Sequence, residues 1–218
     1  QPLRATPGAE LVPVDSEHML YLLYTSGTTG RPKGIRRPIP PGDPDLIANA
    51  NALFGRAFDF RPFDGPMLVS TGMFHGGSHS YYMGGLNVGH ALVIMDRFDP
   101  EACLQLIERH HVTHAQFVPT MFVRMLKLPE EVRRRYDVSS LKAVVHAAAP
   151  CPAEVKRHMI EWWGPIIYEY YSATEGMGAT FINSEEALAK PGSVGRAMVG
   201  EIHVLDEFGN DLGPNEIG

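Results

Sequence analysis

The sequence predicts an α/β fold with a mostly parallel sheet and flanking helices. Short apolar runs alternate with longer segments of helical pattern, and a strand–helix–strand succession produces a parallel sheet covered on both faces. Pro100, Pro119 and Pro152 stand where three of the helical segments begin, a position that proline favours. Of the 218 residues, 44% are hydrophobic and 20% are charged, which is typical of a globular chain with a substantial core.

The elements follow one another along the chain in a regular order. An apolar run over 19–23 predicts a buried strand, and it leads into a loop of glycines and hydroxyl residues. Pro32 disfavours helical geometry at the preceding residue, so no helix is expected directly after Gly30. The proline-rich stretch at 36–45 predicts an exposed loop. Further strands are predicted at 67–71, 91–95, 113–118, 141–147 and 166–170, and helices at 45–60, 99–110, 119–128 and 152–163.

The end of the chain changes character at residue 192. An alternating strand at 201–205 and a turn at 207–210 predict a β-hairpin that opens a different, antiparallel unit. We therefore expect an α/β core over residues 1–191 and a hairpin unit over residues 192–218.

Charge and composition exclude several classes of function. The net charge is −6 and no long basic block occurs, which argues against a nucleic-acid partner. No apolar stretch approaches the roughly 20 residues of a membrane span. Cys103 and Cys151 belong to different elements, and the first residues do not resemble a signal peptide. These features predict a cytoplasmic protein.

The loop YTSGTTGRPKG at 24–34 has the residues of a phosphate cradle. Its glycines allow the backbone to approach a ligand, and its hydroxyls, N–H groups and Lys33 are donors for phosphate oxygens. It does not fit the Walker pattern, because Lys33 follows Pro32 and precedes Gly34. Composition alone leaves a phosphate-binding loop and an ordinary surface loop equally open.

A second loop, within IIYEYYSATEG at 166–176, follows a predicted strand directly. Together with YTSGTTGRPKG and four shorter motifs, it makes the chain resemble the adenylate-forming superfamily of acyl-CoA synthetases, luciferases and adenylation domains of peptide synthetases. The motifs occur in the family's order over residues 19–218. The shorter motifs are FHGG at 74–77, VPTM at 118–121, AAAPCP at 147–152 and GSVGR at 192–196.

The resemblance implies that ATP and Mg²⁺ join a carboxylic acid to AMP, and that the acyl group then passes to coenzyme A. It implies that Tyr171 stacks on adenine against the backbone of residues 148–150. It implies catalytic residues Lys33, Thr174 and Glu175; cofactor-binding residues Thr25, Ser26, Gly27, Thr28, Thr29, Gly30, Lys33, Ala148, Ala149, Pro150, Glu169, Tyr170, Tyr171, Ser172 and Thr174; a substrate pocket of His75, Gly76 and Ala147; and Mg²⁺ ligands Glu175 and Thr25.

The chain departs from the family's pattern at two places. Ser172 stands where the family has a glycine, and Ala147-Ala148-Ala149 stand where it has Gly-Gly-Ala. Both changes add methyl-sized bulk beside the expected nucleotide and acyl sites. The segment STGMFHGGSHS at 70–80 has no aspartate of the kind that holds the substrate amine in peptide-synthetase domains, which favours an acid without an amine. The segment 72–86 is rich in Gly, Met and Tyr, so a fatty, aryl or steroid-like acid would fit there.

The resemblance implies that the hairpin unit over residues 192–218 is the start of a β-barrel. It also implies that parts of the family's usual chain lie outside these residues. They are an N-terminal portion, a ribose-binding aspartate, a hinge, and a lysine-bearing C-terminal lid domain. We therefore expect a central fragment that is inactive alone and self-associates through surface exposed by truncation. Two alternatives stay open, namely an acyl-AMP ligase that loads a carrier protein and a non-catalytic nucleotide-binding module.

Overall fold

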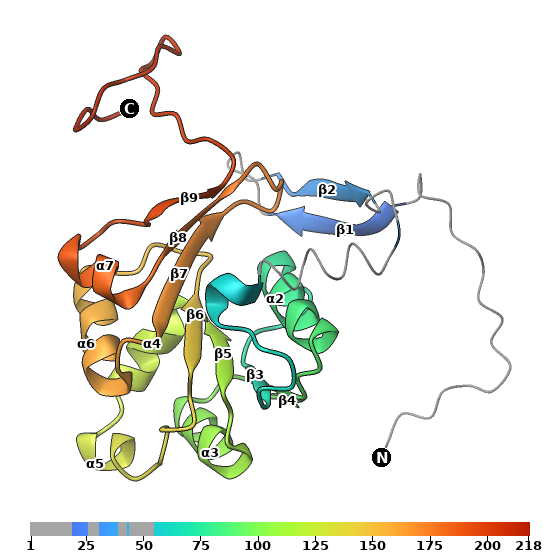
Figure 1. Cartoon of the computed structure of the whole chain (residues 1–218), viewed down its shortest axis with the longest axis vertical. Coiled ribbons are helices and arrows are strands. Elements are labelled where there is room, and N and C mark those ends of the chain that lie inside the picture. The colour runs from blue at the N-terminus through green and yellow to red at the C-terminus, as the bar shows by residue number, and fades with distance from the viewer. Residues whose placement is uncertain (1–18, 26–30, 39–42, 44–54) are drawn as a thin grey trace, which may run out of the picture. The chain divides into compact units, whose positions relative to one another are not determined.

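The computed structural model describes residues 19–25, 31–38, 43 and 55–218 (Figure 1). The chain divides into two compact units, Gln1–Ile47 and Ala48–Gly218, which are described separately. Most of the helix predicted over 45–60 lies outside the described residues. Its described end is a single 3₁₀ turn, η1 (Arg56–Phe58), which the left-handed backbone of Asp59 terminates.

The described part of the first unit is an antiparallel pair of strands, β1 (Met19–Thr25) and β2 (Lys33–Pro38). The predicted strand is confirmed, but its expected burial is wrong at Leu22, whose side chain is 39% exposed. A two-stranded ribbon has no second layer of its own to cover both faces. β2 also occupies the first three residues of the predicted loop over 36–45, because their backbone pairs with β1.

The second unit contains a seven-stranded sheet in the order β4-β3-β5-β6-β7-β8-β9. The strands from β4 to β7 are parallel to their neighbours, and β8 and β9 are added antiparallel. The mostly parallel α/β fold is thus confirmed. The strands are β3 (Met67–Val69), β4 (Leu92–Ile94), β5 (His114–Phe117), β6 (Ala143–His146), β7 (Ile167–Ser172), β8 (Ala179–Ile182) and β9 (Arg196–Val199).

Three of the predicted helices are present as α3 (Pro100–His110), α4 (Pro119–Leu126) and α6 (Ala153–Trp163). Three further helices were not predicted: α2 (Gly76–Asn87), α5 (Glu130–Arg133) and α7 (Ser184–Ala189). α7 begins with a reciprocal capping box between Asn183 and Glu186, which satisfies two backbone N–H groups at its start.

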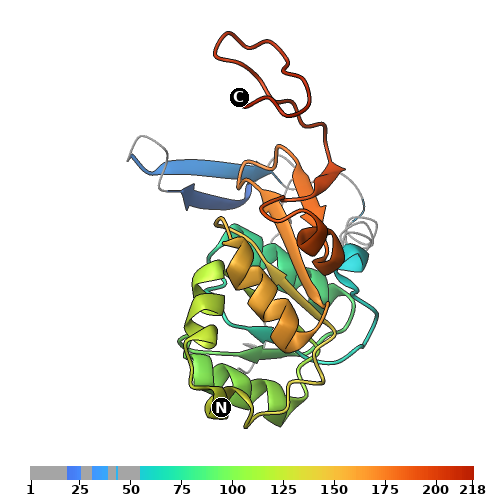
Figure 2. The same ribbon diagram turned by 90° about the vertical axis from the view of Figure 1, so that its left-hand side faces the viewer.

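Side chains on the two faces of the sheet belong to two separate hydrophobic clusters. Along β6, Val144 packs into the cluster that contains residues of α3, α4 and α6, whereas Val145 packs into the cluster that contains Tyr81 and Tyr82 of α2. α2 and α6 thus lie on opposite faces of the sheet (Figures 1 and 2). The alternation follows from the two-residue period of a strand.

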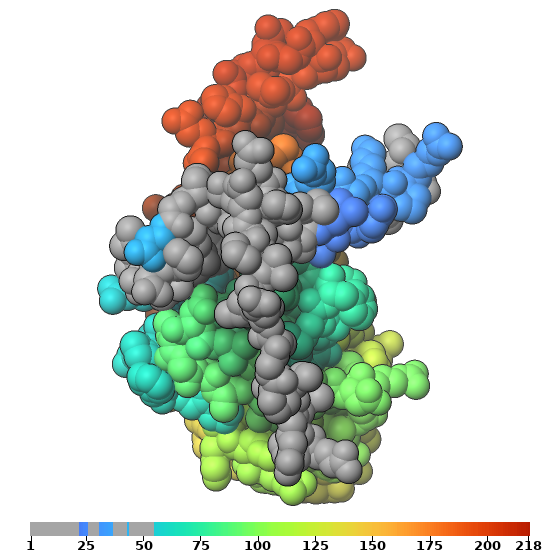
Figure 3. Space-filling model, turned by 90° about the vertical axis from the view of Figure 1, so that its right-hand side faces the viewer, coloured from blue at the N-terminus to red at the C-terminus, as the bar shows by residue number. Residues whose placement is uncertain are grey.

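Residues 200–218 form an exposed loop beyond β9, drawn red in Figure 3. The strand predicted at 201–205 is wrong, since only one isolated bridge, Leu205 with Asp211, forms there. The carboxylate of Asp206 accepts the N–H groups of Phe208 and Asn210, and this closes the turn without a ladder. The boundary proposed at residue 192 stays a prediction. In the part of the chain that the structure describes, no helix has the length and hydropathy needed to cross a membrane.

Candidate functional site

Four loops of the second unit leave the sheet at the same edge. They follow the carboxyl ends of β3, β5, β6 and β7, which are parallel and therefore finish side by side. Ligands of open α/β sheets bind at this edge. The edge carries most of the predicted site residues of this unit, which are His75, Gly76, Ala147, Ala148, Ala149, Pro150, Tyr171, Ser172, Thr174 and Glu175.

The loop between β6 and α6 exposes its backbone to the edge. Ala147 is buried, whereas Ala148, Ala149 and Pro150 are exposed. Ala148 has φ of 74°, in the left-handed region that glycine occupies without strain and other residues occupy at a cost of roughly 1–2 kcal/mol. The strain falls at one of the two alanines that stand where the resemblance expects glycine.

The end of β7 presents alternate side chains to alternate faces. Ile167 and Glu169 are buried on the α6 face, and Tyr171, which follows on that face, is 64% exposed. Beyond it the Ser172 hydroxyl donates to the Gly178 carbonyl at 2.6 Å and holds the following loop against the strand. Thr174, half-buried, and Glu175, exposed, lie in that loop. Tyr171 and the loop 147–150 therefore belong to the same corner of the edge.

The side chain of Tyr170 lies on the opposite face, against α2. Its hydroxyl accepts a hydrogen bond from Gln116 Nε2 at 2.9 Å. A Cβ placed on Gly77 would lie 2.6 Å from the Tyr170 hydroxyl oxygen, so β7 and the first turn of α2 touch closely. On the α6 face, β7 thus offers only the backbone of Tyr170. The predicted contact between Tyr170 and the cofactor therefore concerns the backbone of Tyr170, and it stays a prediction.

A network of hydroxyl groups holds the start of α2 in place, and no role was predicted from the sequence for the residues that form it. Ser70 Oγ donates to the Gln116 carbonyl at 2.5 Å. Thr71 Oγ1 donates to Ser78 Oγ at 2.7 Å and lies 3.1 Å from the Tyr82 hydroxyl. His75 is the N-cap residue of α2, exposed at the edge. The sequence signal that could have indicated this network is the pair of hydroxyl residues, Ser70 and Thr71, at the end of the predicted strand 67–71.

A buried ion pair lies below the loop 147–150. Lys156 of α6 donates to Glu169 Oε2, and Glu169 is one of the predicted cofactor-binding residues. His146 Nε2 is 3.8 Å from the same carboxylate oxygen. Burial, reinforced by the positive charge of Lys156, lowers the pKa of His146 to about 3 and keeps its imidazole neutral.

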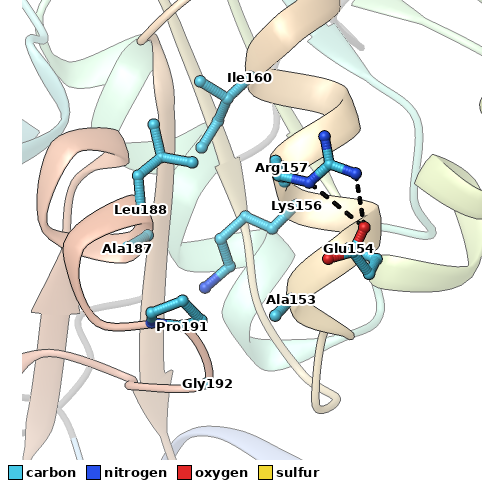
Figure 4. Close-up of a pocket in the computed structure, with 9 residues that line it drawn as sticks. All are labelled: Ala153, Glu154, Lys156, Arg157, Ile160, Ala187, Leu188, Pro191 and Gly192. Atoms are coloured by element: carbon cyan, nitrogen blue, oxygen red, sulfur yellow. Dashed lines mark hydrogen bonds and ion pairs between the residues drawn. The ribbon is translucent and has the colours of Figure 1, made fainter.

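Lys156 also lines a pocket between α6 and α7 (Figure 4). Its side chain points into this pocket, whereas Arg157 points away and binds the Glu154 carboxylate at 2.6 Å. The lining residues are Ala153, Glu154, Lys156, Arg157, Ile160, Ala187, Leu188, Pro191 and Gly192. No role was predicted from the sequence for Lys156 or His146.

The first unit carries the other predicted residues. Thr25 and Lys33 are direct partners in the β1–β2 ladder, at the end where residues 26–32 connect the two strands along the chain. Residues Ser26, Gly27, Thr28, Thr29 and Gly30 lie outside the described residues. Because Thr25 and Glu175 belong to different units, their pairing at a metal ion stays a prediction.

An exposed tyrosine, the loop 147–150 and a Thr-Glu loop thus lie at the carboxyl edge of a mostly parallel sheet, which is where open α/β sheets bind ligands. The chain belongs to the AMP-binding enzyme family, whose model matches residues 2–218. This confirms the resemblance to adenylate-forming enzymes.

Curated relatives are CoA ligases by name. The chain is 30% identical over 211 residues to "Probable CoA ligase CCL5" of Humulus lupulus, covering 94% of this chain and 37% of that one. It is 33% identical over 213 residues to "Acyl-CoA synthetase 7" of Caenorhabditis elegans, covering 92% and 37%. The chain thus spans less than two fifths of these relatives' length.

Solved structures match the fold. "ATP bound MatB from Rhodopseudomonas palustris" superposes with a TM-score of 0.74 at 25% identity, covering 94% of this chain and 39% of that chain. The N-terminal domain of FACL13 from Mycobacterium tuberculosis gives 0.72 at 24% identity, covering 93% and 49%. The fold is therefore that of part of the N-terminal domain of adenylate-forming enzymes.

Proposed function

We propose that the protein carrying this chain activates a carboxylic acid with ATP and transfers the acyl group to coenzyme A. One observation carries the proposal. In a chain of the AMP-binding enzyme family, the loop 147–150 and the segment 171–175 meet at one corner of the carboxyl edge. This corner contains the exposed ring of Tyr171, the exposed residues 148–150 and the side-chain oxygens of Thr174 and Glu175. An aromatic ring can stack on a base, and a hydroxyl group can donate a hydrogen bond to a phosphate oxygen.

The proposed roles follow from the types of side chain. Tyr171 stacks on the adenine, and the backbone of 148–150 covers its other face. The Thr174 hydroxyl donates to the α-phosphate, while Lys33 and the loop 25–30 hold the β- and γ-phosphates. An oxygen of the acid's carboxylate attacks the α-phosphorus of ATP. The bond between that phosphorus and the pyrophosphate leaving group breaks as the new bond forms. Because no covalent step falls to the protein, its part is positioning and charge stabilisation.

Two oxygen donors, one from each unit, are the proposed ligands of Mg²⁺. The Glu175 carboxylate and Thr25 hydroxyl supply the hard oxygen ligands that this cation prefers. Bound there, Mg²⁺ would neutralise charge on the triphosphate. His75, Gly76 and Ala147 border the proposed acid site, for a fatty, aryl or steroid-like acid. Coenzyme A is the proposed acceptor, because two curated relatives are named CoA ligases and a third is named an acyl-CoA synthetase.

The decisive experiment measures acid-dependent pyrophosphate release by the complete gene product with a panel of acids. Glu175→Gln keeps the side-chain volume and removes the charge, so we expect at least about a tenfold loss, or 1.4 kcal/mol in the barrier. Glu185→Gln, which changes another exposed glutamate, is the matched control. A Glu175→Gln rate within about twofold of wild type would refute the metal role.

The acceptor is tested in the same preparation. Adding coenzyme A should produce acyl-CoA, with free thiol consumed as AMP is released. Acyl transfer to a carrier protein but not to coenzyme A would instead support the carrier-loading alternative. Nucleotide binding without release of pyrophosphate with any acid would favour a non-catalytic module.

A further inference from the structure

Three polar side chains from three elements meet beneath the loop 147–152. His146 and Glu169 are direct partners in the parallel register of β6 and β7. Lys156 reaches them from the start of α6 and donates to Glu169 Oε2. His146 Nε2 lies 3.8 Å from the same oxygen. The ion pair therefore joins α6 to β7, beside His146 of β6.

The group is buried. Side-chain exposure is 8% for Lys156, 6% for Glu169 and 0% for His146. Among the described residues, neither ring nitrogen of His146 makes a hydrogen bond, and its ring packs edge-on against Phe122. Since the imidazole is neutral, the charge of Lys156 is what balances Glu169. Within the part of the chain that the structure describes, Lys156 is the one charged partner of Glu169, and a buried carboxylate that loses its cation is strongly destabilised.

The ion pair connects the two sides of the proposed adenine site. Lys156 lies four residues after the loop 147–152, in the helix that the loop enters. Glu169 lies two residues before Tyr171, on the same face of the same strand. Shifting α6 relative to β7 would separate the loop from the tyrosine, and the ion pair opposes that shift.

We infer that Lys156 is a positioning residue: by holding Glu169, it sets the spacing between the backbone of 148–150 and the Tyr171 ring, and so determines affinity for the adenine base. The inference rests on the proposed function, which places adenine between these walls. Lys156 lies below the site and touches neither base nor phosphate. Its effect is therefore confined to ligands that carry the base, and pyrophosphate binding does not depend on it.

The test compares AMP and pyrophosphate binding by calorimetry on the complete gene product. Lys156→Met retains the length of the side chain and removes its charge. We expect at least about a tenfold weaker affinity for AMP and a change in pyrophosphate affinity below about twofold. Lys156→Arg, which preserves the cation, should recover AMP affinity to within about threefold of wild type.

A neighbouring residue gives the matched control. Arg157→Met removes an adjacent but more exposed cation, paired with Glu154 and Glu161, and should leave both affinities unchanged. If Lys156→Met does not fold, Lys156→Gln removes the charge but keeps a donor for Glu169, and it should fold with at least about a threefold loss of AMP affinity. Wild-type AMP affinity in either folded variant would overturn the inference.

The two proposals fail in different ways. AMP binding by wild type without acid-dependent turnover would reject the proposed function and leave the positioning role to be decided by Lys156→Met. Turnover with unchanged AMP affinity in Lys156→Met would reject only the positioning role. A wild-type protein that binds no AMP would reject both.

Discussion

Acid should destabilise the second unit, because its core contains two histidines that are kept neutral. His114 of β5 and His146 of β6 are both fully buried. Burial is the main cause that lowers the pKa of His114 from 6.5 to about 4, and that of His146 to about 3. In the unfolded chain both imidazoles titrate near 6.5. Below that pH the unfolded chain binds more protons than the folded one, so stability falls.

The magnitude follows from the two pKa values. Above about pH 7 neither histidine contributes to the pH dependence, since both states are neutral. Between 6.5 and each folded pKa, every pH unit removes about 1.4 kcal/mol of unfolding free energy per histidine. At about pH 4.5 each histidine has removed about 2.5 kcal/mol, together about 5 kcal/mol, which is a third or more of the roughly 5–15 kcal/mol by which natural domains are stable.

Urea unfolding followed by circular dichroism, from about pH 7.5 to about pH 4.5 at constant ionic strength, measures this loss. His114→Gln replaces one buried imidazole by an amide that does not titrate, so the slope should fall to about half. His110→Gln, at an exposed position in the last turn of α3, should leave the slope unchanged. An unfolding free energy that does not vary with pH, or a full slope in His114→Gln, would refute the reasoning.

Three further substitutions test the backbone and the acid site. Ala148→Gly should raise the unfolding free energy by about 0.5–1 kcal/mol through release of left-handed strain, whereas Ala147→Gly should lower it. Gly195→Ala places a Cβ 1.9 Å from a backbone carbonyl oxygen of β8, whereas a Cβ on Gly192 would have open space. Gly195→Ala should therefore lower the unfolding free energy by at least about 2 kcal/mol more than Gly192→Ala. Equal urea midpoints for the two variants would contradict this. His75→Ala should change the preference among acids while the KM for ATP stays constant, and an effect on ATP alone would remove His75 from the acid site.

The strands from β3 to β7 and the helices α3, α4 and α6 were predictable because pattern and chemistry agree there. Apolar runs of strand length alternate with amphipathic segments that begin at proline. α2 was not predictable in this way. Gly76, Gly77, Gly84 and Gly85 lower its helix propensity, and its formation depends on burying Tyr81 and Tyr82 against the sheet. β8 and β9 were missed because short antiparallel strands depend on their partners.

The edge of the candidate site followed from sequence for the same reason that the sheet did. Once 141–147 and 166–170 are parallel neighbours, the residues that follow them must lie close together. What does not follow from sequence is the buried group beneath that edge. Lys156 lies in an amphipathic helix, where a lysine normally reaches solvent. Its partner Glu169 is on another element, and no local pattern links two such positions.

The ion pair between Lys156 and Glu169 constrains how this chain can diverge. A first substitution at either position leaves an opposite charge alone in an apolar interior, and the second substitution relieves it. The effect of a change at one position therefore depends on the residue at the other. A substitution of Lys156 by arginine conserves the charge, so it is the first step with the least cost. Across the descendants of this chain the two positions should change together, and an alignment deep enough to detect covariation would show them as a linked pair.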